Sequence, residues 1–84
     1  MNAKHRKTLE AIFAKQTPKT LPFRNIESLL VAVGCRVIEG DGSRVQFKIQ
    51  GEEWLTHRPH PQKIAKPYQV KDVRNFLSRI GIEP

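Results

Sequence analysis

The chain has 84 residues, of which 38% are hydrophobic and 27% charged, and it carries a formal net charge of +7. This length fits one domain with a single modest core, and the composition is that of a folded protein rather than a disordered one. No apolar run approaches the roughly 18 residues of a membrane span, and no apolar segment follows the basic start at Met1–Lys7, so we expect no secretory signal. The single cysteine, Cys35, excludes an intramolecular disulfide and cysteine-rich zinc sites, and it indicates a reducing compartment.

The positive charge is concentrated in two segments of the chain. Residues 4–24 carry six basic side chains and one acidic one, and residues 57–82 also carry six and one. Residues 25–56 carry three basic and five acidic side chains. Two basic segments around a mildly acidic middle favour binding of a polyanion. A solvated basic surface, or one that docks on an acidic protein, is an equally open alternative.

The first part of the chain is expected to form two helices. Residues 3–14 can form a helix with one apolar side, and the proline-containing segment 17–22 ends it. Asn25 is a suitable N-cap for a second helix, which Gly34 should end. The apolar residues that give these helices their buried sides are Leu9, Ile12, Phe13, Ile26, Leu29, Leu30 and Val33.

Three strands are expected next. Residues 35–39 predict a short strand, and the turn-forming residues 40–43 reverse the chain. Residues 44–49 alternate between apolar and polar side chains, which is typical of a strand with one buried face. Gly51 marks a second reversal, so residues 53–58 should pair back as the second strand of a hairpin.

A last helix should follow the hairpin. Pro67 suits the first turn of a helix, and Gly81 should end it. Its apolar side consists of Val70, Val73, Phe76 or Leu77, and Ile80. The predicted order is therefore α-α-β-β-β-α, an α+β fold in which helices cover one face of a three-stranded antiparallel sheet.

Two aromatic residues have two interpretations each. A period of two cannot decide whether Trp54 or Leu55 faces the core. A tryptophan on the open face could stack on a base, although packing across the strands is the favoured interpretation. Tyr68, at the start of the last helix, has the same two interpretations.

The loop after the hairpin holds the side chains most suited to chemistry. Cleavage of RNA without a metal needs one group that accepts a proton and one that donates a proton, and imidazole suits both roles near neutral pH. His57, Arg58, His60 and Lys63 bring imidazoles and cations together within a short segment stiffened by prolines. Two histidines in one loop are also common as plain surface groups. A metal site is less favoured, because only Glu52 and Glu53 could add ligands.

The order and spacing of several short motifs resemble the HicA toxins of bacterial HicAB toxin–antitoxin systems. These motifs are Leu29-Leu30 with Gly34, Gly42-Ser43 opening a strand with Phe47, Arg58-Pro59-His60-Pro61, Lys66-Pro67 before a helix with Val73, and Gly81-Ile82. The resemblance covers about Phe23 to Ile82. It implies a small fold like that of a double-stranded-RNA-binding domain. It also implies an mRNA interferase, an endoribonuclease that needs no metal or other cofactor and is neutralised by a HicB antitoxin in the bacterial cytoplasm.

The chain departs from the family pattern at two places. In the family the Gly-Ser pair is followed by the catalytic histidine, whereas Arg44 follows Gly42-Ser43 here. A guanidinium stays protonated near neutral pH and cannot act as a base, although it can bind a phosphate. The family's Gly-Thr at the start of the last helix is Tyr68-Gln69 here, which removes a threonine cap.

Three hypotheses follow from the pattern and its departures. His60 or His57 has taken over the proton transfer in a ribonuclease, or the protein binds RNA without cutting it, or it is an interaction domain whose basic face docks on an acidic antitoxin. Residues 1–84 are expected to be a single domain in which residues 1–20 form a helical extension. Gly42 and Ser43 should shape the site, and no metal is expected. The last helix should present Lys71, Arg74 and Arg79 outward, and the expected RNA-binding residues are Arg44, Lys48, Arg58, Lys63, Lys66, Lys71 and Arg74.

Overall fold

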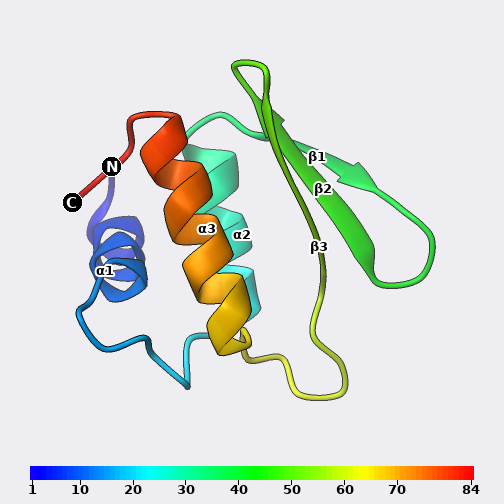
Figure 1. The fold of residues 1–84 in the computed structure, drawn as a ribbon, viewed down its shortest axis with the longest axis horizontal. Helices are drawn as coiled ribbons and strands as arrows, with labels where there is room; N and C mark the ends of the chain where they lie inside the picture. The colour runs from blue at the N-terminus through cyan, green and yellow to red at the C-terminus, as the bar shows by residue number, and fades with distance from the viewer.

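The structure, a computed structural model that describes residues 1–84, has three helices and one three-stranded sheet (Figure 1). The elements are α1 (Ala3–Ile12), α2 (Phe23–Ala32), β1 (Arg36–Glu39), β2 (Arg44–Ile49), β3 (Glu52–His57) and α3 (Pro67–Arg79). The order α-α-β-β-β-α and the α+β class predicted from the sequence are confirmed. No helix is long and apolar enough to cross a bilayer.

The strands form an antiparallel sheet in the order β1-β2-β3, and its inner face is apolar. Phe47 lies opposite Val37 on one side and opposite Trp54 on the other. The rings of Phe47 and Trp54 stack with their centroids 5.7 Å apart, and Phe23 of α2 meets both rings edge-on. Trp54 therefore belongs to the core and does not offer a stacking surface to a base, whereas Leu55 is 67% exposed on the open face.

The helices form two layers on the inner face of the sheet. Helices α2 and α3 pack against the strands, and α1 covers the far side of these two helices (Figure 1). From α1 only Thr8, Leu9 and Ile12 are buried, and Leu9 and Ile12 join the same hydrophobic core as the sheet residues. The open face of the sheet has no covering layer (Figure 1). One core therefore joins all six elements, as expected for a chain of this length.

The start of α2 differs from the prediction. The helix begins at Phe23, with Pro22 in the N-cap position, and not after Asn25. Two tertiary contacts bring this start forward, because the ring of Phe23 is buried and its N–H donates to the carbonyl oxygen of Lys63 at 3.0 Å. The helix stops where the glycine predicted it. Gly34 has a φ of 109°, and the N–H of Cys35 returns to the carbonyl of Leu30 at 2.9 Å, the bond that closes a Schellman motif.

Candidate functional site

A cleft of about 690 Å³ opens at one end of the sheet. The start of α2, the turn between β1 and β2, and the loop between β3 and α3 form its walls. The turn contributes Gly42 and Ser43, and the loop contributes His60 and Lys63. Gly42 and Ser43, expected to shape the site, thus lie beside His60 and Lys63. The remaining lining residues are Pro22, Phe23, Arg24, Glu27, Arg58, Pro59 and Ile64.

The loop that carries His60 is attached at both ends. At its start, the N–H of Arg58 donates to the carbonyl of Ser43 at 2.8 Å, which extends the β2–β3 ladder by one residue pair. Pro59 is buried next to it. At its end, Ile64 forms an antiparallel bridge with Pro22, the residue before α2. The imidazole of His60 is exposed between these two attachments, so it is held over the cleft without being covered.

The side chain of Arg58 joins three elements. It makes four hydrogen bonds of 2.6–3.0 Å to the carboxylates of Glu27 on α2 and Glu39 on β1, which leaves one guanidinium N–H unused. The hydrogen bonds from Arg58 lower the pKa of Glu39, and those to Glu39 and Glu27 raise the pKa of Arg58 above its usual value. Arg58 therefore acts mainly as an internal clamp, and little of its donor capacity remains for a phosphate.

The cleft is electrostatically positive once this clamp is taken into account. Glu27 is its only carboxylate, and Arg58 pairs with it at 2.9 Å while also pairing with Glu39. The Arg58 clamp thus carries one net negative charge, against the two positive charges of Arg24 and Lys63. Arg24 and Lys63 are exposed and form no salt bridge. No group of three or more His, Cys, Asp or Glu side chains lies close enough together to hold a metal ion. The cleft thus offers two free cations, a hydroxyl and an imidazole.

The family comparison covers the whole of this region. A family model described as the HicA toxin of bacterial toxin–antitoxin matches residues 23–82, from the first residue of α2 to the segment after α3. The chain belongs to the HicA toxin family. No curated protein and no solved structure gives a significant match. Helix α1 and the loop that follows it lie outside the matched residues.

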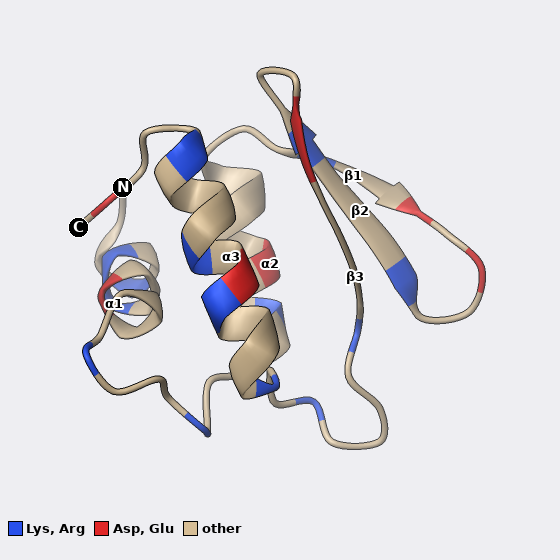
Figure 2. Ribbon diagram, in the orientation of Figure 1, with Lys and Arg blue, Asp and Glu red and all other residues tan.

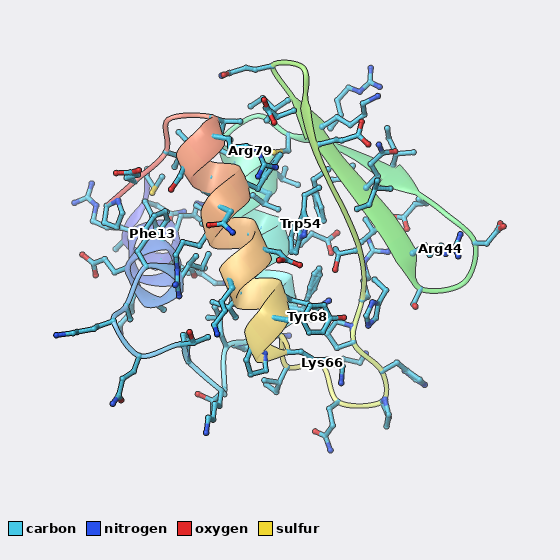
Figure 3. The ribbon with its side chains drawn as sticks, in the orientation of Figure 1. Phe13, Arg44, Trp54, Lys66, Tyr68 and Arg79 are labelled. Carbon is cyan, nitrogen blue, oxygen red and sulfur yellow. The ribbon has the colours of Figure 1, made fainter.

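Arg44, at the position where the HicA resemblance places a histidine, lies outside the cleft. It starts β2 directly opposite His57 of β3. Arg44 lines a second, smaller hollow of about 480 Å³, together with Ile38 and Leu55 of the open face. Figure 3 shows Arg44 near the end of the sheet and away from Tyr68 of α3. The predicted site residues therefore divide between the cleft, which holds His60, and the open face, which holds Arg44.

The Tyr68-Gln69 pair that distinguishes this chain from the HicA pattern has a structural consequence. Gln69 is completely buried, and its side-chain oxygen accepts the N–H of Lys66 at 3.0 Å, so it replaces the lost cap from inside the helix. Its amide donates to the Thr56 hydroxyl at 2.9 Å and the His57 carbonyl at 2.8 Å. Tyr68 is 49% exposed, and its ring lies 6.5 Å from the His57 ring. Gln69 thus joins α3 to the last residues of β3.

The cations predicted on the last helix have different environments. Lys71 is exposed, as are Lys63 and Lys66 in the loop before the helix. Arg74 is not presented outward as expected: it is half-buried and donates to the carbonyl of Ile12 at 2.7 Å. Arg79 is paired with Glu52 at 2.9 Å. Lys48 lies half-buried on β2 and makes no salt bridge.

Three residues of the site were not singled out from the sequence. Arg24 was missed because the helix was expected to begin after it, and Glu27 entered only the charge count of residues 25–56. A period of two through β1 places Glu39 on the same side as the apolar Val37, but this pattern gives no indication of an ion pair. The Glu39 side chain is 66% exposed, so burial does not require a partner for it, and only the fold brings it to Arg58.

Proposed function

We propose that this HicA-family toxin binds mRNA in the cleft and cleaves it with His60 as the proton-transferring group. The proposal rests mainly on one observation. His60, Lys63 and Arg24 line one cleft with the Gly42-Ser43 turn, and the only carboxylate of this cleft is paired with Arg58. A flexible polyanion fits such a cleft better than a neutral or cationic ligand does.

Binding would depend on the phosphates of the RNA backbone. Arg24 at the start of α2 and Lys63 on the loop both line the cleft, and both are exposed. A strand lying in the cleft can place a phosphate within reach of both. Such contacts release counterions from the RNA. We therefore expect the logarithm of the association constant to fall by about 0.7 for each phosphate contact when the salt concentration rises tenfold.

Cleavage would use the RNA's own 2′-hydroxyl as the nucleophile. Its oxygen forms a bond to the neighbouring phosphorus while the bond from phosphorus to the 5′-oxygen breaks, which leaves a 2′,3′-cyclic phosphate and a 5′-hydroxyl. His60 accepts the proton of the 2′-hydroxyl, and water or a second acid supplies a proton to the 5′-oxygen. Arg24 and Lys63 balance the charge that develops on the phosphate oxygens.

His57 is the second candidate for the catalytic imidazole. It lies directly opposite Arg44, the position where the resemblance places a histidine, and Arg44 could bind a phosphate there. The exposed ring of Tyr68 beside it could stack on a base. His57 is only half-buried, so RNA on the open face can reach it. Separate substitution of the two histidines distinguishes the two sites.

The test is purified protein mixed with an unstructured RNA across a range of pH with EDTA present. We expect cleavage by the wild type and a loss of at least about 100-fold in His60→Ala, the lower end of what a proton-transferring group contributes. His5→Gln is the matched control, because His5 lies on α1 and contacts Ser28 of α2 rather than the cleft. Both variants should retain the wild-type circular dichroism spectrum.

Three other outcomes redirect the proposal. A loss in His57→Ala with full activity in His60→Ala moves catalysis to the open face. Undiminished activity in the double variant shows that neither imidazole performs the chemistry. Intact RNA in every reaction, together with salt-dependent binding, leaves an RNA-binding toxin that does not cut. Inducible expression followed by inspection of total RNA gives the same comparison in cells.

The proposed partner is a HicB-like antitoxin in the bacterial cytoplasm. An antitoxin that places carboxylates against Arg24 and Lys63 would occupy the cleft and exclude RNA. We expect a small protein encoded beside this gene to co-purify with the wild type, and to be lost from the Arg24→Glu/Lys63→Glu variant. Retention of the partner by that variant would place the antitoxin contact elsewhere.

A further inference from the structure

Two loops that are far apart in the sequence lie side by side at the cleft. They are residues 13–22, between α1 and α2, and residues 58–66, between β3 and α3 (Figure 1). The Pro22–Ile64 bridge joins them. It is flanked by hydrogen bonds from Phe23 N–H to the Lys63 carbonyl at 3.0 Å and from Ala65 N–H to the Leu21 carbonyl at 2.8 Å. The loop after α1 therefore continues the wall of the cleft.

The joined loops carry basic side chains and no acidic ones. Neither residues 11–26 nor residues 58–71 contain an aspartate or a glutamate. Figure 2 shows basic segments following both loops along one edge of the molecule, without an acidic segment between them. Apart from Arg58, the cations of the two loops and of the helix starts that follow them are exposed and form no salt bridge. They are Lys15, Lys19, Arg24, Lys63, Lys66 and Lys71.

The loop after α1 is held in place rather than free to move away. Arg74 of α3 donates from Nε to the carbonyl of Ile12 at 2.7 Å and from a terminal nitrogen to the Thr17 hydroxyl at 3.5 Å. Ile12 itself is fully buried. Arg74 therefore acts through the loop: its guanidinium fixes the backbone on which Lys15 and Lys19 stand.

We infer that the loop 13–22 extends the RNA-binding surface, so that a single strand bound in the cleft continues across Lys19 and Lys15. The inference rests on the proposed function, because it adds phosphate contacts to the same strand. Pro22 lines the cleft, and three residues of chain span at most about 11 Å, so Lys19 lies next to the cleft mouth. Loop 13–22 precedes residues 23–82, which match the HicA family model. The proposed extension of the RNA-binding surface therefore lies outside the matched part of the chain.

The experiment measures binding of 2′-O-methylated RNA, which cannot undergo attack by a 2′-hydroxyl, as a function of salt. Two oligomers are used, of about 4 and about 16 nucleotides, the range of single-strand site sizes in small folds. The salt slope is the fall in the logarithm of the association constant for a tenfold rise in salt concentration. For the long oligomer, Lys15→Gln/Lys19→Gln should lower this slope by about 1.4, or about 0.7 for each lost phosphate contact. The slope for the short oligomer, which occupies the cleft alone, should not change.

The control is Lys4→Gln/Lys7→Gln, which removes the same charge from the exposed start of α1. It should leave both slopes within error of the wild type. Equal changes in the two double variants, or no change in either, would overturn the inference. If Arg24→Gln/Lys63→Gln weakens binding of both oligomers in that case, RNA binding in the cleft is supported and only its extension along loop 13–22 is contradicted. If neither oligomer binds the wild type, the proposed function itself fails.

Discussion

Arg44 and His57 are cross-strand neighbours at the end of the β2–β3 ladder. The next pair, Ser43 and Arg58, is hydrogen-bonded at 2.8 Å, so the Arg44–His57 pair is a non-hydrogen-bonded one, whose side chains lie closer together. A HicA-family chain with an arginine in place of the expected histidine thus has an imidazole on the neighbouring strand. Whether that imidazole can substitute for the missing one is open to a direct test.

If His57, the second candidate, performs the chemistry, Arg44→His should raise RNA cleavage by about tenfold or more. The substitution restores the Gly-Ser-His sequence of the family and places two imidazoles opposite each other, so one could accept a proton while the other donates one. Arg44→Gln is the control, because it removes the charge without adding an imidazole. Cleavage rates for the three proteins are compared on one RNA. Equal rates in the histidine and glutamine variants would mean that position 44 takes no part in the chemistry.

Gln69→Leu should lower the free energy of unfolding by about 2–4 kcal/mol. The change keeps an apolar body in a fully buried site but leaves the Lys66 N–H and the His57 carbonyl without partners, and each such group costs about 1–3 kcal/mol. Urea denaturation measures the difference. Gln62→Leu, on the exposed part of the loop, is the matched control and should stay within about 0.5 kcal/mol of wild type. A similar loss in both variants would contradict the role assigned to Gln69.

The Arg58–Glu39 contact should make stability dependent on acid pH. Hydrogen bonds from Arg58 lower the pKa of Glu39 in the folded state, so the contact stabilises the fold above the ordinary glutamate pKa. The contribution is lost as the pH falls through the lowered folded pKa. Melting temperatures of wild type and Glu39→Gln should therefore differ at neutral pH and converge in acid. Glu83→Gln, which removes a charge near the chain end, should show no such convergence.

Cys35 should react slowly with thiol reagents in the folded protein. Burial raises the pKa of its thiol from 9.0 to about 11, and the side chain is only 7% exposed. At pH 8 a shift of this size lowers the thiolate fraction by about 100-fold, before reduced access is considered. Labelling by a disulfide reagent should be fast in guanidinium chloride and slower by at least that factor in buffer. Equal rates in both conditions would show that the segment around Cys35 opens readily.

The local pattern of the sequence was sufficient to predict the helices, the strands and their order along the chain. Alternation in residues 44–49 predicted β2, and the glycine at position 34 predicted the end of α2, because both signals depend on neighbouring residues alone. The motif order was also sufficient for the HicA resemblance, which the match to residues 23–82 confirms. The histidine loop and the Gly42-Ser43 turn were predicted at one site, and the structure brings both to the cleft.

The tertiary structure alone decided which charged and aromatic side chains are available to a ligand and which are used in internal contacts. The sequence offered Arg58 and Arg74 as phosphate ligands, but their partners Glu27 and Ile12 lie 31 and 62 residues away. Only packing of α2 on the sheet and of α1 on α3 brings these groups within hydrogen-bonding distance. It also turned Trp54 inward, because Phe23 of α2 closes over that face of β3. Periodicity identifies the faces of an element, but contacts between distant segments determine what each face meets.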